Sequence, residues 1–237
     1  MDSSKPSIGF GSLVEDIFGL NIRGLRTIRD VLMNPQGVAE AAKDEDWLGR
    51  YTPSIRLVFF LLTLTGVLRF LWAPEDGALT ADLIASFQDR ALEGRDAVQA
   101  ADQFWAIHGA LFPFLAVALV ILAASFVRVW GAGTSLALRV RLHMMILIPS
   151  CAFSVLAISA FALYDQSWQH GFVVITAVSL SAAMLIDFVV ATRTVAATST
   201  IGKVVKAFLF ASVNQVMMML AATIAASVAV TIAMQSQ

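Results

Sequence analysis

The sequence feature that most constrains the fold is a pair of long apolar runs separated by a short basic loop. The runs extend over residues 104–129 and 142–164. Since a helix rises about 1.5 Å per residue, each run is long enough to cross the ~30 Å hydrocarbon core of a bilayer. The loop between them contains Arg139 and Arg141. We therefore expect a helical hairpin inserted in a membrane, with its turn at one surface.

The composition extends this prediction to the whole chain. Of its 237 residues, 58% are apolar and 14% are charged, and the mean hydropathy is +0.78. Soluble domains contain about 25% charged and about 45–50% apolar residues, so the composition indicates a protein with several membrane spans. The net charge of −1 gives no reason to expect a nucleic-acid partner.

The apolar runs predict an all-α membrane protein with five transmembrane helices. The expected spans are residues 55–72, 104–129, 142–164, 171–192 and 207–234. They form a transmembrane domain over residues 53–237, preceded by cytoplasmic amphipathic or interfacial helices in residues 1–52. A polar, acidic connection over residues 74–103 is expected to carry a short solvated helix on the outer face.

The segment before the first span predicts an amphipathic helix. Apolar residues recur at helical spacing over residues 12–33. Basic residues lie between them at Arg23, Arg26 and Arg29. This pattern is typical of a helix in a membrane interface, and it also fits a helix packed on the inner face of the protein itself. Asn34 and Pro35 are expected to end this helix and to cap the next one.

The distribution of cationic residues predicts the orientation. Of the 16 lysine and arginine residues, all but Arg69, Arg90 and Arg95 fall on the same side of the predicted spans as the N-terminus. Cytoplasmic loops are enriched in these residues. We therefore expect the N-terminus on the cytoplasmic side of the membrane and the C-terminus on the outer side.

A polar cluster is expected inside the membrane. Asp187 is the one carboxylate within a predicted span, and Asn214 and Gln215 lie at a similar depth. A carboxylate in a span is a candidate functional group, for example in a proton relay. The position of Asp187, about one helical turn from the membrane boundary, favours instead a structural ion pair. Its expected partner at the inner edge is Arg139, Arg193, Lys206 or water.

The histidines give a weaker prediction. His108 and His170 begin two spans near the outer surface and could together bind haem or a metal. Neither has a second ligand one helical turn away, so isolated interfacial histidines are the expected state, with no cofactor. His143 follows Arg139 and Arg141, and it is expected to face lipid headgroups.

Small residues in the last span predict a surface for close helix packing. They occur at Ala222, Ala225, Ala226 and Ala229. Such spacing allows two helix backbones to approach closely. The partner helix could belong to the same chain or to a second copy.

The layout resembles that of the Yip-type membrane proteins, including their bacterial members. The resemblance rests on Asn34-Pro35 after an amphipathic segment and before five spans. It rests also on a Gly-x-Gly-Thr-Ser loop that leads into Leu138-Arg139-Val140, with Pro149 in the next helix. Eukaryotic members are linked to vesicle traffic and small GTPases. The resemblance implies a five-helix fold and carries over no site residue.

Together with the resemblance, these observations favour a non-enzymatic scaffold or accessory subunit of the bacterial inner membrane, with its C-terminus in the periplasm. We expect it to bind lipid, another membrane protein or a second copy of itself. The sequence contains no nucleophile motif, metalloprotease motif or phosphate-binding glycine loop. One alternative is a small transporter or proton-coupled permease that uses Asp187, Asn214 and Gln215. Another is a haem or metal site between His108 and His170.

Overall fold

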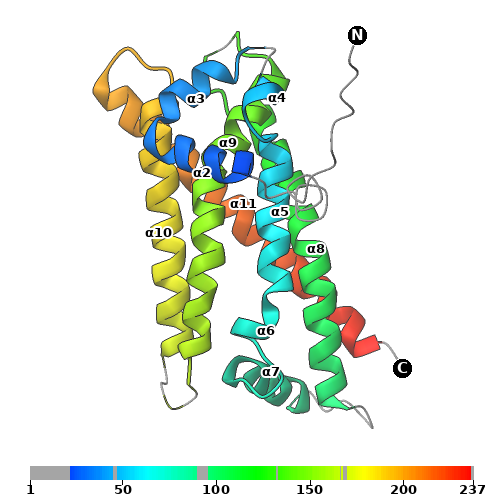
Figure 1. Ribbon diagram of the computed structural model, residues 1–237. Coiled ribbons are helices and arrows are strands. Elements are labelled where there is room, and N and C mark those ends of the chain that lie inside the picture. The colour runs from blue at the N-terminus through cyan, green and yellow to red at the C-terminus, as the bar shows by residue number, and fades with distance from the viewer. Residues whose placement is uncertain are drawn as a thin grey trace, which may run out of the picture.

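The computed structural model describes residues 22–44, 47–89, 96–131, 133–165, 167 and 170–235. Within these residues the chain is helical and has no strand. Four of the described helices are long and apolar enough to cross a bilayer (Figure 1). They are α8 (Ala97–Phe126), α9 (Leu136–Ala157), α10 (Gly171–Thr194) and α11 (Thr200–Gln235), and a 3-10 helix (Ile158–Leu163) continues α9. The prediction of an all-α membrane protein is confirmed.

The predicted first span, residues 55–72, consists of two helices rather than one. Helix α5 (Ser54–Val67) has 14 residues, and the short α6 (Arg69–Trp72) follows after Leu68. At about 1.5 Å per residue α5 alone is shorter than the hydrocarbon core. The indole nitrogen of Trp72 donates a hydrogen bond of 2.8 Å to the Thr65 carbonyl, and this bond ties α6 back onto the last turn of α5.

Short helices cover one end of the bundle (Figure 1). They are α2 (Ile22–Met33), α3 (Pro35–Ala41) and α4 (Trp47–Arg50). The predicted cap is confirmed, because the Asn34 side chain accepts a hydrogen bond of 3.1 Å from the Gly37 amide. Helix α2 buries Val31 against the protein and leaves Leu32 and Met33 exposed. The predicted start of this helix, residues 12–21, lies outside the described residues.

The basic loop between α8 and α9 is shorter than predicted. Helix α9 begins at Leu136, where Ser135 accepts a hydrogen bond from the Leu138 amide, so the predicted start at residue 142 is wrong by six residues. Arg139 and Arg141 are therefore helical. Their guanidinium groups donate to backbone carbonyls, Arg139 to that of Ser125 at 2.8 Å and Arg141 to that of Ala42 at 2.6 Å. These bonds allow the helix to start within the basic segment.

Helix α9 occupies the middle of the bundle. Its residues 142–150 are buried without interruption, and it contacts α2, α5, α8 and α10. Helix α11 crosses the bundle obliquely and packs along α8 and α10 (Figure 1). Ala225 and Ala229 are fully buried within the chain, and Ala229 packs with Ala97, Ala100 and Ala101. Ala222 and Ala226 are only partly buried. Part of the predicted small-residue face therefore serves packing inside the bundle.

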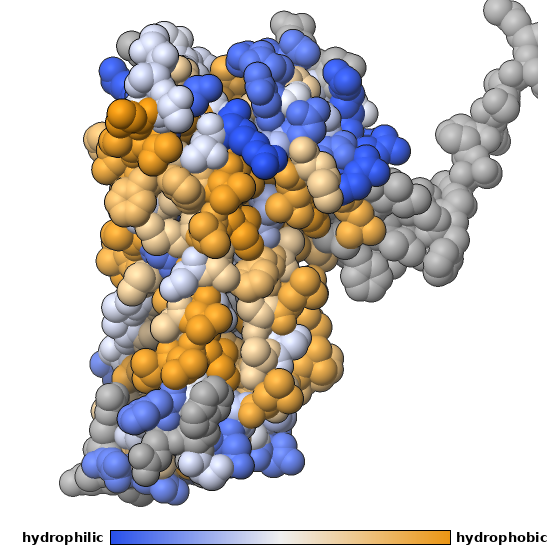
Figure 2. All heavy atoms as spheres, turned by 90° about the vertical axis from the view of Figure 1, so that its left-hand side faces the viewer, coloured by the Kyte–Doolittle hydropathy of each residue, from blue (hydrophilic) through white to orange (hydrophobic). Residues whose placement is uncertain are grey.

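The surface matches a membrane-embedded bundle. Figure 2 shows a broad apolar band between two hydrophilic ends. Large apolar side chains such as Phe114, Leu122 and Val173 are exposed along the long helices. An apolar surface of this extent is stable in lipid and would cause aggregation in water.

The end of the bundle opposite α3 holds the acidic connection. Helix α7 (Ala78–Gln88) lies there (Figure 1), and residues 90–95 of the connection lie outside the described residues. Arg69 forms an ion pair of 2.7 Å with Asp102. The Tyr164 hydroxyl donates a hydrogen bond of 2.7 Å to Asp82, and this bond raises the pKa of Tyr164.

Helices α5 and α8 approach closely at two glycines, which gives a stability prediction. A Cβ atom on Gly66 would lie 3.5 Å from the Cα atom and the carbonyl oxygen of Gly109. A methyl group there makes ordinary van der Waals contact, whereas a longer side chain must either push the two helices apart or fill a cavity that both glycines also line. We expect Gly66→Ala to be tolerated and Gly66→Leu to lower the free energy of unfolding by about 1–3 kcal/mol. Thermal unfolding in mild detergent measures both.

The matched control is Gly133→Leu. A Cβ atom on Gly133 meets nothing within 4 Å, so the same substitution there should leave the melting temperature unchanged. Equal melting temperatures for Gly66→Leu and the wild type would contradict the proposed close contact.

Candidate functional site

A polar cluster lies buried in the membrane-spanning part of the bundle. His143 from α9 and Asn214 from α11 have no exposed surface, and Asp187 from α10 is 3% exposed. Ser150, two helical turns after His143, is also buried. We call these four residues the polar cluster. Three different helices contribute to it, so its geometry depends on how those helices pack.

The histidine forms the shortest polar contact of the cluster. Its Nε2 atom lies 2.5 Å from the Asn214 Oδ1 atom. An amide oxygen only accepts hydrogen bonds, so Nε2 carries the hydrogen and His143 donates. The ring packs 4.4 Å from the Phe210 ring and 6.0 Å from that of Trp130, between centroids. The prediction that His143 faces headgroups is therefore wrong. The guanidinium groups of its basic neighbours bond to the backbone, and the imidazole turns into the bundle.

Asp187 also differs from its predicted surroundings. Its carboxyl group faces the Ser150 hydroxyl and the Asn214 amide. It forms no ion pair within the part of the chain that the structure describes. The expected pairing with Arg139, Arg193 or Lys206 is wrong, since Arg139 and Lys206 donate to the Ser125 and Ala196 carbonyls. Arg193 lies at the end of α10, in the cavity described below.

The structure brings together two of the three predicted cluster residues. Asp187 and Asn214 face each other, whereas Gln215 is only half-buried and takes no part. Successive helical residues are about 100° apart around the axis, so Gln215 cannot share the direction of Asn214. The sequence reasoning missed His143 and Ser150. Their spacing of seven residues places them on one helix face and was the available signal.

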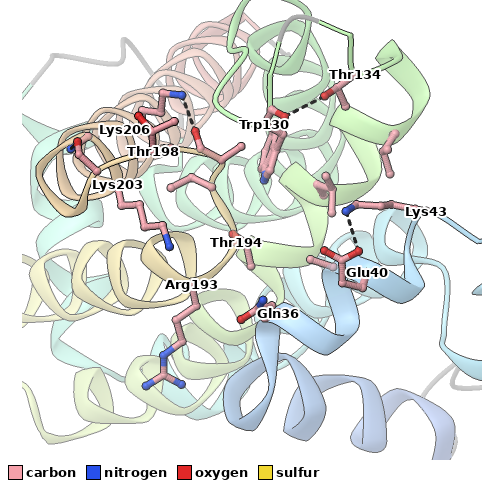
Figure 3. Close-up of a pocket in the computed structure, with 18 residues that line it drawn as sticks. Gln36, Glu40, Lys43, Trp130, Thr134, Arg193, Thr194, Thr198, Lys203 and Lys206 are labelled. Atoms are coloured by element: carbon pink, nitrogen blue, oxygen red, sulfur yellow. Dashed lines mark hydrogen bonds and ion pairs between the residues drawn. The ribbon is translucent and has the colours of Figure 1, made fainter.

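A basic cavity of about 770 Å³ opens at the end of the bundle that α3 covers. It lies between α3, the turn before α9 and the connection from α10 to α11 (Figure 3). Its charged lining residues are Lys43, Arg193, Lys203, Lys206 and Glu40. Hydroxyl groups from Thr134, Thr194, Thr198 and Ser199 add to this lining. The lining of the basic cavity therefore carries more positive than negative charge.

Two of the cations in the basic cavity are without a counter-ion. Lys43 pairs with Glu40 at 2.7 Å, and Lys206 donates to a backbone carbonyl. Arg193 and Lys203 form no ion pair among the described residues. Both come from the same side of the cavity, opposite Lys43 (Figure 3). This side presents two exposed positive charges that an anion could neutralise.

An apolar groove of about 260 Å³ adjoins the basic cavity. Its lining residues are Leu32, Pro35, Leu185, Ile186, Val189, Val190 and Arg193. Arg193 thus belongs to both the groove and the cavity. A molecule with a negative head and an apolar chain would fit such a pair of neighbouring sites.

The other predicted basic residues occupy two environments. Arg23, Arg26 and Arg29 are exposed on α2, where Arg29 pairs with Asp30 at 2.7 Å. Arg139 and Arg141 are half-buried and bonded to the backbone. None of these five arginines lines the basic cavity, in contrast to Arg193.

A second cavity, of about 440 Å³, lies toward the opposite end of the bundle and is mostly apolar. His108 lines it and stacks between Phe104 and Phe112, with ring centroids 5.7 and 5.8 Å away. His170 is exposed at the start of α10. The structure does not bring the two histidines together, and the described residues contain no cluster of three metal-binding side chains. The geometry gives no support to a haem or metal site between them.

Comparisons of the chain with protein-family models, with curated proteins and with solved structures give no match. The resemblance to the Yip-type proteins therefore stays a prediction.

The hydrogen bond between His143 and Asn214 predicts a stability change. The variant Asn214→Leu leaves the buried Nε2–H group of His143 unpaired, so we expect a loss of about 1–3 kcal/mol in the free energy of unfolding. Replacing both partners with leucine should recover part of that loss, because no unpaired donor remains. Denaturant unfolding in detergent measures the double-mutant cycle.

Gln215→Leu is the matched control on the neighbouring, half-buried position. It should change the free energy of unfolding by less than about 0.5 kcal/mol. If Asn214→Leu proved no more destabilising than this control, the hydrogen bond would have no stabilising role.

Proposed function

We propose that the protein is a non-enzymatic accessory protein of the bacterial inner membrane that binds an anionic phospholipid. The single observation that carries this proposal is the position of Arg193, which lines both the basic cavity and the apolar groove. A soluble anion would use the cavity alone, and an uncharged lipid would use the groove alone. An anionic phospholipid uses both.

The headgroup would occupy the basic cavity. A phosphate bound there would neutralise Arg193 and Lys203, whose charges are otherwise unpaired among the described residues. Charge-assisted hydrogen bonds from guanidinium and ammonium groups to phosphate are among the strong polar contacts in proteins. Near a negatively charged membrane surface each such cation contributes about 1 kcal/mol to binding.

One acyl chain would lie in the groove beside α10. Leu32, Leu185 and Val189 are exposed there, at 43%, 60% and 41%. Leu32 belongs to α2, so the amphipathic helix would form one wall of the lipid site and lie at the membrane interface. This arrangement favours lipid over a partner membrane protein as the occupant, because the apolar groove and the basic cavity share the cation Arg193.

The proposed topology has five spans. In Figure 1, α5 and α6 lead from the end covered by α3 to the end that holds α7. Helix α5 supplies roughly 21 Å of this path at about 1.5 Å per residue, and α6, which bends away at Leu68, carries the chain on to the far end. Counting them as the first span leaves the basic cavity on the cytoplasmic side and the C-terminus on the periplasmic side. The resemblance to Yip-type proteins supports the same number of spans.

A proton-coupled permease is the second candidate function. The buried carboxyl group of Asp187 favours it, although Gln215 lies outside the polar cluster. An intramembrane carboxyl group without a cationic partner is a recurrent feature of proton-coupled membrane proteins.

The lipid proposal predicts a loss of binding on charge reversal. In the variant Arg193→Glu/Lys203→Glu, we expect affinity for phosphatidylglycerol in nanodiscs or mixed micelles to fall at least about tenfold, because two attractive charges become repulsive. Native mass spectrometry of bound lipid measures this affinity. Phosphatidylcholine should bind weakly to wild type and variant alike.

Arg50→Glu is the matched control, since Arg50 is exposed and does not line the cavity. It should retain phosphatidylglycerol. Competition with inorganic phosphate separates the two sources of the anion: full displacement of the lipid would show that the cavity binds phosphate alone. Equal lipid binding by the double variant and the wild type would overturn the proposal.

The proposed topology predicts the location of the C-terminus. Alkaline phosphatase fused after Gln237 should be active, because the enzyme folds only in the oxidising periplasm. A fusion after Thr198, between α10 and α11, should be inactive. Activity of the second fusion and inactivity of the first would reverse the assigned orientation.

A further inference from the structure

We propose that the polar cluster is a proton-binding site in the membrane core, in which Asp187 takes up and releases the proton and the His143–Asn214 pair positions its carboxyl group. The proposal is independent of lipid binding. It rests on the unsatisfied polar atoms of the cluster, on the kinds of group that face one another there and on the position of the cluster between two cavities.

Three buried atoms of the cluster have no hydrogen-bond partner among the described residues. They are His143 Nδ1, Asp187 Oδ1 and Asn214 Nδ2. Each belongs to a different helix, namely α9, α10 and α11. A buried polar atom without a partner costs roughly 1–3 kcal/mol, so a fold that keeps three of them in one cluster calls for a functional explanation.

The donors and acceptors of the cluster limit what can bind there. A metal cation requires several lone-pair donors, but the Asn214 oxygen already accepts from His143 and the Asn214 Nδ2 group is itself a donor. An anion would meet the carboxyl group of Asp187. A proton on Oδ1 satisfies that acceptor, and the oxygen of a water molecule would accept a hydrogen bond from the donor Nδ2. The structure therefore favours a proton over either kind of ion.

The charges around Asp187 favour reversible protonation. The titratable group whose electrostatic interaction reaches it is Cys151 of α9, whereas His143 of α9 contacts Asn214, which in turn faces the carboxyl group. Helix α11 contributes the uncharged Asn214. Arg139 and Lys206 bond to backbone carbonyls elsewhere, and no described cation pairs with the carboxyl group. A carboxylate without a counter-ion is costly in the membrane, and taking up a proton removes this cost.

The cluster lies between the two cavities. On one side, His143 packs against Trp130, and Trp130 lines the basic cavity. On the other side, the Ser154 hydroxyl donates to the Ser150 carbonyl at 2.9 Å, and Ser154 lines the apolar cavity. Trp130 and Ser154 thus each contact a residue of the cluster and line a cavity. When Asp187 takes up the proton, an O–H bond forms on its carboxyl group and an O–H bond of a hydronium ion breaks, leaving water; release reverses both changes.

Infrared difference spectroscopy of the full-length protein in nanodiscs tests the proposal. We expect a carbonyl-stretching band of a protonated carboxyl group that titrates between acidic and alkaline pH and shifts in heavy water. Asp187→Asn should remove the band. Asp102→Asn is the matched control, because Asp102 is half-exposed in an ion pair, and it should leave the band unchanged.

Two further variants keep the test decisive. Asp187→Glu retains a carboxyl group and should give a titrating band at a shifted frequency even if Asp187→Asn fails to fold. His143→Gln should change the proton affinity by about tenfold, since it alters the positioning pair. A band that persists in Asp187→Asn, or that does not titrate, would overturn the assignment. An unchanged midpoint in His143→Gln would remove the positioning role.

Discussion

The structure depends on the pairing of polar groups inside a region without water. In the hydrocarbon core each backbone N–H and C=O group must find its hydrogen-bond partner within the protein. The four long helices provide these partners through their own helical hydrogen bonds. Side chains follow the same constraint. Hydroxyl groups such as those of Thr63 and Ser154 donate to carbonyls one turn earlier in their own helix. At the ends of the bundle, Arg139 and Arg141 satisfy carbonyls of other segments and so join the helices that meet there.

The sequence predicts the long helices well because apolar length is a local property. The spans at residues 171–192 and 207–234 correspond to α10 and α11, which begin at Gly171 and Thr200. The first span is less well predicted. Residues 55–72 are predominantly apolar, but the chain bends at Leu68, where Trp72 folds back onto Thr65. That bend depends on a tertiary contact of the indole and has no signal in hydropathy.

The polar cluster was only half predictable for a similar reason. The depth of a residue along the membrane normal follows from its position in the span. The prediction that Asp187 lies near Asn214 was based on this depth alone. Rotation of a helix about its axis follows from packing instead. It turns His143 inward between Phe210 and Trp130, and it turns Gln215 away. Arg139 and Lys206 do not form the expected ion pair with Asp187, because each donates a hydrogen bond to a nearby backbone carbonyl. A cationic group at the membrane edge can be satisfied by such carbonyls as well as by a carboxylate.

The lipid site and the proton site share α10 and yet face different ways. Asp187 and Arg193 are six residues apart, which places them roughly 120° from each other around the helix. The carboxyl group faces α9 and α11, whereas the guanidinium group faces the cavity and the groove beside α2 and α3. A change at Arg193 can therefore alter the electrostatics of the membrane surface without touching the polar cluster. The two proposals can fail separately, and a chain that kept one activity after losing the other would show that α10 serves two sites rather than one.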